Sequence, residues 1–447
     1  MQNLLTTIVA NYFPSKFAQR LLGGFAWNSF GAVTSRGTLL LANIIVARIV
    51  GVTSFGEFLI VTSTVLSVCV LVDLGLGLTA TKFISEYRES NPGKIGNLLV
   101  FLLSLTMLSG LSVGFGLFFY AGEVASYLEA PKLEEFIKII SFQPIFLAAV
   151  SLGSGLIIGL EQFKKLAVIN LIMGGLNLGG VIAGALLFGI EGVLWANLGL
   201  SIVNLAIVMY VLAGCLVSLP LSIKPNLMLG DFKKLFNFSF PSLMIGLTYG
   251  PPIWFCNALL VTTENGFEQM AILGAAMQWY AIATFLPGSL ALVILPVSSN
   301  LAVTSSNQAF RDLIIKACGS SLLVTAPIVV LIALCSPFIM GLYGPGFSDG
   351  AKVLIILMCS GIFVSIQTIV GNTLSAKGKI WGQLVMNVSW ALIFVAVAKM
   401  WVSSHGATGV VAARTIACFL LMVGSIAYAF FITRTNDIYQ VESRGSK

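Results

Sequence analysis

The sequence has 447 residues, of which 57% are hydrophobic and only 9% are charged, and its mean hydropathy is +0.99. A soluble protein of this length would have roughly a quarter of its residues charged, so this class is excluded. The net charge of +7 does not indicate nucleic-acid binding, because the basic residues lie in short loops between hydrophobic blocks. The composition predicts an integral membrane protein.

The hydrophobic blocks are about twenty residues long, which is enough to cross a hydrocarbon core of about 30 Å as a helix. Backbone polar groups in lipid must be bonded within the segment, so we expect helices rather than open strands. The predicted fold class is an all-α membrane protein of about 12 transmembrane helices in two six-helix lobes. The expected spans are 21–47, 55–80, 95–120, 134–160, 166–189, 192–213, 238–262, 268–298, 312–335, 350–375, 380–402 and 407–432.

These spans predict the following organisation. Apolar residues at helical spacing before Pro14 indicate an interfacial N-terminal segment, and the longest connection contains two prolines and a short amphipathic stretch. An even number of spans places both termini on one side. Most of the 24 lysine and arginine residues fall in the loops of that side, which predicts that it is cytoplasmic. The segments are an interfacial segment 1–20, an N-lobe 21–213, a cytoplasmic linker 214–237, a C-lobe 238–432 and a cytoplasmic tail 433–447.

The two lobes have the pattern of an internal repeat. Identical residues recur 217 positions apart at equivalent places in the helix order, namely Asn170 and Asn387, Gly192 and Gly409, and Ala196 and Ala413. Repeats of six helices keep the same membrane orientation, so an axis along the membrane normal should relate them. In transporters of this design the substrate site lies between the repeats.

Short motifs along the chain resemble a known family. The segment ARIVGVTSFGEFLIVTSTVLSVCVLVDLGLGLTATKFISEYRE, residues 47–89, looks like the opening of polysaccharide-biosynthesis flippases. GLIIGLEQFKK (155–165), Phe240–Pro241 and LYGPGF (342–347) fall where that family has similar motifs. The sequence is therefore similar to the O-antigen (Wzx-type) flippases of the multidrug/oligosaccharidyl-lipid/polysaccharide exporter superfamily.

The resemblance implies a V-shaped fold around a central cavity. It also implies an undecaprenyl-pyrophosphate-linked oligosaccharide as substrate, flipped from the cytoplasmic to the periplasmic leaflet of a bacterial inner membrane by alternating access. The implied partners are this lipid-linked oligosaccharide, membrane lipids, a polysaccharide polymerase and a chain-length regulator.

Charged residues inside the spans are the first candidates for function, because a charge in lipid is costly. Arg36 lies about fifteen residues into the first span, or about 22 Å. Its side chain should face a hydrated cavity or an anion, and its guanidinium suits a pyrophosphate or an acidic sugar. Asn28 and Asn43 lie beside or on the same helical stripe. The alternative is an intramembrane pair with Asp73 or with backbone carbonyl groups.

Other charged residues have two interpretations each. Arg414, about five residues into the last span, lines the same cavity or extends to the interface. Arg48 ends the first helix near Glu57, which predicts an interfacial ion pair or a turn anchor. Asp73, near the end of the second span, pairs with Lys82 or Arg36 or responds to protons.

Polar amides occur at helical spacing in several spans. Asn197 lies with Ser201 on the sixth span, Asn170 with Asn177 on the fifth, and Asn387 with Gln383 on the eleventh. These side chains could bond sugar hydroxyl groups, but such residues more often join helices to one another.

Enzymatic chemistry has little support in the sequence. There is no Walker A sequence, no Gly-x-Ser-x-Gly and no HExxH. A single histidine and seven scattered cysteines predict neither a metal site nor a cofactor site. We expect a transporter that is not an enzyme. The alternatives are a multidrug or cation antiporter of the same superfamily, which should have acidic residues deep in its helices, and a non-transport scaffold of a polysaccharide assembly complex.

Overall fold

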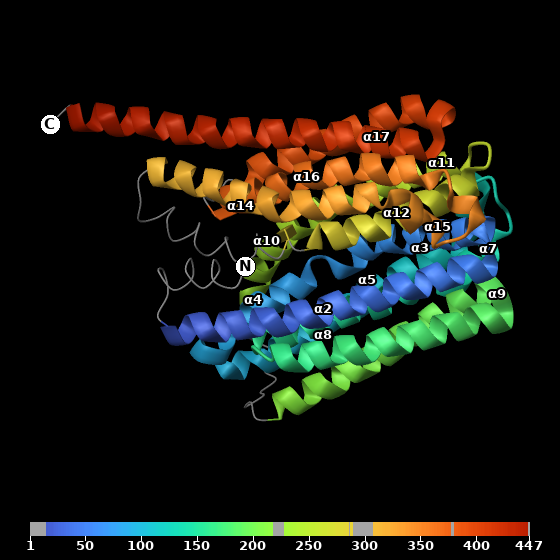
Figure 1. Ribbon diagram of the computed structural model, residues 1–447. Coiled ribbons are helices and arrows are strands. Elements are labelled where there is room, and N and C mark those ends of the chain that lie inside the picture. Colours follow the sequence, from blue (N-terminus) through green and yellow to red (C-terminus); the bar gives the residue numbers. More distant parts are fainter. Residues whose placement is uncertain (1–14, 218–227, 286, 289–306, 377–379, 446–447) are drawn as a thin grey trace. The chain divides into compact units, whose positions relative to one another are not determined.

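The computed structural model describes residues 15–217, 228–285, 287–288, 307–376 and 380–445. Nine helical stretches among these residues are long and apolar enough to span a membrane, and the regular structure of the described part is helical throughout (Figure 1). The predicted all-α membrane fold is confirmed. The predicted segment 1–20, linker 214–237 and span 268–298 each lie partly outside the described residues.

Contacts divide the chain into two compact units, Met1–Trp254 and Phe255–Lys447. The described helices of unit 1 are α2 (Ser15–Val50), α3 (Val52–Asp73), α4 (Leu76–Ser90), η1 (Pro92–Lys94), α5 (Ile95–Phe119), α6 (Ala121–Tyr127), α7 (Leu133–Ile140), α8 (Gln143–Gly159), α9 (Phe163–Leu216) and α10 (Met228–Leu247). Helix α11 (Gly250–Val261) contains the boundary between the units. Helix α10, where we predicted the C-lobe to begin, packs on α3, α4 and α5 of unit 1.

Unit 2 contains α12 (Gly266–Ala283), α14 (Asn307–Leu334), α15 (Ser336–Gly341), η3 (Pro345–Phe347), α16 (Gly350–Ala376) and α17 (Ile380–Gly445). Helix α16 packs on both α14 and α17. Helix α17 stays helical beyond residue 432, where we predicted a tail.

Small residues bring the helices of unit 1 together. Helix α2 packs most extensively on α9, and a Cβ atom on Gly31 would lie only 2.9 Å from the Cα atom of Ala167. A Cβ atom on Gly155 of α8 would collide with the backbone of Gly77 in α4. A hydrophobic core between α4, α5, α8 and α9 surrounds this second contact. Close backbone approach is the usual basis of helix association in membranes.

Helices α9 and α17 each contain two predicted spans. The backbone leaves the helical conformation at Gly189 (φ 60°, ψ −137°) and at Gly406 (φ 53°, ψ −134°), so each element is a helical hairpin (Figure 1). The predicted breaks between 189 and 192 and between 402 and 407 are confirmed. We predicted about twelve spans. Counting each hairpin as two spans raises the nine helical stretches of the described residues to eleven.

Two helices end four residues before a proline. A proline ring clashes with the carbonyl group four residues earlier. Helix α10 ends at Leu247, four residues before Pro251, and α12 ends at Ala283, four residues before Pro287. The predicted breaks in the seventh and eighth helices are confirmed.

The second span is not the continuous helix that we predicted for 55–80. It is interrupted between α3 and α4, where Leu74 (φ 47°) and Gly75 (φ 69°) both adopt the left-handed conformation. Hydropathy is continuous through this point, so the hydrophobic pattern alone could not reveal the break.

Candidate functional site

Arg36 lies on the side of α2 that faces away from α9. The packing face of α2 is marked by Gly31 against Ala167 and by Thr38 against Gly174. At about 100° per residue, Arg36 is roughly 140–160° around the helix from both positions. Its side chain is exposed, and it is 14 residues before the end of α2, or about 21 Å along the axis.

The polar stripe that contains Arg36 becomes covered toward the end of α2. Leu40 and Asn43 are only 8% and 9% exposed, respectively. Asn43 is therefore a buried amide, whereas Arg36 is accessible. The side chain of Asn28 lies outside the described residues.

The candidate amides of α9 lie next to helix contacts. Asn170 is half-buried, one turn from Gly174 on the side that packs on α2. The amide of Asn197 donates to the carbonyl oxygen of Val193 at 2.9 Å, within its own helix. Gln143 of α8, which the sequence analysis did not select, donates to Ser201 at 3.1 Å. The Gln143–Ser201 bond joins α8 to α9.

The acidic candidates have specific partners. Glu57 forms an ion pair with Lys132 at 2.5 Å, and its side chain is 5% exposed; Arg48, which we expected beside Glu57, is exposed at the end of α2. Asp73 is bonded by the Ser151 hydroxyl and the Gly75 backbone. Lys82, proposed as a partner of Asp73, is exposed with its Nζ atom over the ring of Phe83, 5.3 Å from its centre.

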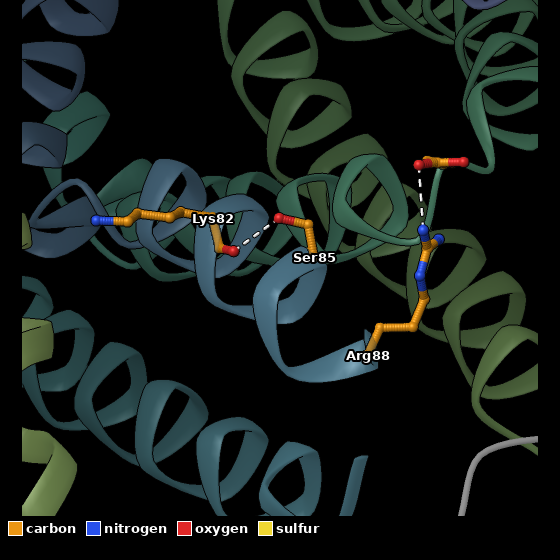
Figure 2. A network of polar contacts seen from close by, with 4 residues as sticks. Lys82, Ser85 and Arg88 are labelled. Atoms are coloured by element: carbon orange, nitrogen blue, oxygen red, sulfur yellow. Dashed lines mark hydrogen bonds and ion pairs between the residues drawn. The ribbon is translucent and has the colours of Figure 1, made fainter. Parts of the chain in front are cut away.

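Helix α4 continues beyond Lys82 into a basic surface. Figure 2 shows the Lys82 and Arg88 side chains pointing in opposite directions, with Arg88 paired to Glu161 at 3.1 Å. The Ser85 hydroxyl donates to the Lys82 carbonyl oxygen at 2.7 Å. Lys94 lies over the Tyr87 ring. This surface corresponds to a loop that we predicted to be cytoplasmic.

Unit 2 contains a half-buried arginine on α17. The guanidinium carbon of Arg414 lies 4.9 Å from the ring centre of Tyr280, which is 7% exposed. Cys256 and Cys418 are both close enough to Arg414 to interact electrostatically with it. Arg414 therefore lies among the helices of unit 2, where cation–π contact accommodates its charge.

Asn387 is the most deeply buried of the candidate amides whose side chains the structure describes, with 1% exposure. It lies one turn before Trp390, whose indole donates to the sulfur of Cys418 at 3.4 Å. Tyr280 and Gln143, in contrast, carried no sequence signal. Each is one polar group in an apolar run, and only the fold shows that it faces another polar group.

A mixed-charge pocket of about 470 Å³ lies at one end of unit 1, lined by Pro131, Lys132, Glu134, Glu135, Phe136, Lys138 and Glu191. Two of its lysines are engaged, since Lys132 pairs with Glu57 and Lys138 pairs with Glu134. These pairs reduce the charge that the pocket offers to a ligand.

The helical architecture resembles that of solved transporter structures. A multidrug resistance MATE family transporter of the MOP superfamily, solved in an inward-facing conformation, matches with a TM-score of 0.79 at 14% identity, over 90% of this chain and 95% of that chain. A MOP superfamily transporter from Pyrococcus furiosus matches with a TM-score of 0.69 at 15% identity, over 92% and 95% of the two chains. These matches define the fold as the MOP fold.

The family follows from the sequence itself. The profile of the polysaccharide biosynthesis protein family matches residues 21–302, and the chain belongs to this family. The family prediction made from the motifs is confirmed.

The names of two curated relatives agree with this family. The EPS I polysaccharide export inner membrane protein EpsE of Ralstonia nicotianae is 25% identical over 173 residues, which cover 38% of this chain and 39% of that protein. EpsE of Ralstonia solanacearum is 28% identical over 188 residues, covering 41% and 42%. The chain thus spans about two fifths of the length of the curated relatives it matches.

Proposed function

We propose that this protein flips an undecaprenyl-pyrophosphate-linked oligosaccharide across the bacterial inner membrane. The direction is from the cytoplasmic to the periplasmic leaflet, and the mechanism is alternating access. The observation that carries the proposal is the match to the polysaccharide biosynthesis protein family over 21–302. The MOP fold supports a transport role, and the names of the EpsE proteins support an inner-membrane location and polysaccharide export.

Arg36 is the residue that we propose to contact the anionic part of the substrate. It is accessible on α2 and faces away from the seam with α9. A guanidinium cannot lose its charge in the membrane, so an accessible arginine within a span is suited to facing water or an anion. A pyrophosphate accepts paired hydrogen bonds from one guanidinium.

Arg414 is proposed as a second cation of the transport path. Its contact with the Tyr280 ring positions the guanidinium and leaves its charge in place. The buried Asn43 and Asn387 are better suited to holding helices together than to binding sugar, whereas Asn170 remains a candidate contact. Asn28 also remains a candidate from the sequence.

The test is complementation of surface polysaccharide in a strain that lacks its own flippase, at matched membrane expression. Arg36→Ala should abolish the polysaccharide and Arg36→Lys should restore part of it. Arg48→Ala, a change of the exposed arginine at the end of the same helix, is the matched control and should retain export. Normal polysaccharide from Arg36→Ala would exclude a substrate contact at Arg36.

The same strain separates the competing functions. Failure of the wild-type protein across several donor sugar structures, together with resistance to cationic drugs, would favour a multidrug antiporter. Export that persists when both Arg36 and Arg414 are replaced would favour a scaffold role within a polymerase and chain-length-regulator complex.

A further inference from the structure

The break between α3 and α4 collects oxygen atoms inside the apolar part of unit 1. Helix α3 ends at Asp73 and α4 begins at Leu76. The last turn of a helix leaves carbonyl groups that the helix cannot bond. One of them, on Val72, accepts the Ser109 hydroxyl at 3.2 Å. The break therefore places a backbone oxygen that is bonded from outside its own helix in a region that hydropathy assigns to the membrane.

Asp73 brings a carboxylate to this break. The Ser151 hydroxyl of α8 and the Gly75 backbone bond the carboxylate. Its Oδ1 atom is fully shielded from solvent and has no hydrogen-bond partner among the described residues. A shielded carboxylate oxygen is costly unless a positive charge or a donor compensates it.

Hydroxyl groups from two further helices surround the same turn. The Thr79 hydroxyl donates to the Gly75 carbonyl oxygen at 2.9 Å and lies 2.7 Å from the Ser239 hydroxyl of α10. A Cβ atom on Gly75 would be 3.4 Å from the Ser242 hydroxyl. The break is thus lined by one carboxylate and several neutral oxygens from α4, α5, α8 and α10.

We propose that this cluster, defined as Asp73, Thr79, Ser151, Ser239 and the carbonyl groups of the α3–α4 break, binds Na⁺. Hard cations take carboxylate, carbonyl and hydroxyl oxygens, and broken membrane helices supply such oxygens in transporters. One carboxylate among neutral ligands balances one positive charge. The described residues contain no group of three or more His, Cys, Asp or Glu that could hold a more highly charged metal ion.

The site goes beyond the proposed function and does not depend on it. A bound Na⁺ would compensate the shielded Oδ1 atom and would join α4 to α10 at the turn where α3 ends. Its binding can be measured on purified protein without any lipid-linked sugar, so failure of the site and failure of the flippase proposal are distinguishable.

The experiment measures thermal unfolding of the purified full chain in detergent while NaCl replaces choline chloride at constant ionic strength. Saturating Na⁺ should raise the midpoint by at least about 2 °C, because a ligand that binds only the folded state stabilises it. Asp73→Asn should abolish the rise, and ²²Na⁺ retained by the wild type should be lost in this variant. Glu161→Gln, which removes a carboxylate from the exposed pair with Arg88, is the matched control and should keep the rise.

Three results would overturn the site: no Na⁺-dependent rise in the wild type, an undiminished rise in Asp73→Asn, or a rise that disappears equally in Glu161→Gln. If the thermal midpoint depends on pH but not on Na⁺, the Oδ1 atom binds a proton rather than Na⁺, which would also contradict the site. Ser151→Ala keeps the carboxylate and provides a second variant should Asp73→Asn fail to fold. It should weaken half-saturation by Na⁺ about tenfold through loss of one oxygen, and unchanged half-saturation would contradict the site.

Discussion

Gly189 and Gly406 adopt the same backbone conformation at the turns of the α9 and α17 hairpins, 217 positions apart, with φ of 60° and 53° and ψ of −137° and −134°. The offset is the one at which Asn170 and Asn387 recur in the sequence. The agreement of offset and conformation supports an internal repeat more strongly than the matching residues alone.

The first prediction is that both hairpin glycines resist substitution, but to different degrees. A residue with a Cβ atom is strained in this conformation by about 1–3 kcal/mol. Gly189 has open space around it, whereas a Cβ atom on Gly406 would lie 2.8 Å from Oε1 of Gln269. Both Gly189→Ala and Gly406→Ala should lower the thermal midpoint in detergent, with the larger loss for Gly406→Ala.

Gly199→Ala is the control for this pair, because Gly199 is helical and has nothing within 4 Å. Its substitution should leave the midpoint unchanged or raise it slightly, since alanine is the better helix former. Equal midpoints for Gly199→Ala and Gly189→Ala would contradict the strain argument.

The second prediction concerns the ring beneath Arg414. Tyr280→Phe keeps the ring, whereas Tyr280→Leu removes a cation–π contact of about 0.5–2 kcal/mol. Tyr280→Leu should therefore lower the thermal midpoint in detergent more than Tyr280→Phe. If Arg414→Gln removes most of this difference, the two side chains are coupled; an unchanged difference would assign it to packing of the ring.

The third prediction tests a contact between α3 and α11. The Trp254 indole donates to the Thr64 hydroxyl at 2.9 Å, and Tyr127 stacks on Trp254 with 6.1 Å between ring centres. Thr64→Val leaves the indole N–H without this acceptor and should cost about 1–3 kcal/mol. Trp254→Phe should make the same Thr64 change nearly neutral in a double-mutant cycle of thermal midpoints. Additive losses would show that the bond contributes nothing.

The sequence was sufficient to predict the helical architecture, but not the helix break after Asp73 or the contacts between distant side chains. Span length and hydropathy predicted the helices, and proline chemistry predicted the ends of α10 and α12, because these are local properties. The break after Asp73 was missed because it lies within an uninterrupted apolar run. Likewise, the partner of Glu57 is Lys132, 75 residues away, and no local pattern encodes a contact at that separation.

The fourth prediction uses pH at a residue outside the predicted spans. Tyr343 is 1% exposed, and burial raises the pKa of its phenol above the usual value of about 10. Above that pH the unfolded chain loses this proton while the folded chain retains it, so the unfolded state binds fewer protons and stability falls as pH rises.

Between pH 8 and about pH 10.5, the thermal midpoint of Tyr343→Phe should therefore fall less than the midpoint of the wild type. At pH 8 the variant should be less stable by about 1 kcal/mol, because the hydroxyl lies 3.3 Å from Oε1 of Gln278. If the thermal midpoints of the variant and the wild type fall by the same amount, Tyr343 has the same pKa in the folded and unfolded states.

The last prediction concerns the unequal burial of the Glu57–Lys132 pair, whose side chains are 5% and 61% exposed, respectively. Removing the lysine leaves a buried carboxylate without this ion pair, which should cost about 1–3 kcal/mol. Removing the carboxylate charge leaves an ammonium group that water can solvate, which should cost less. Lys132→Ala should therefore lower the thermal midpoint more than Glu57→Gln, and adding Lys132→Ala to Glu57→Gln should cost little further. A larger loss from Glu57→Gln would mean that Glu57 contributes through its other contacts and that the lysine is dispensable.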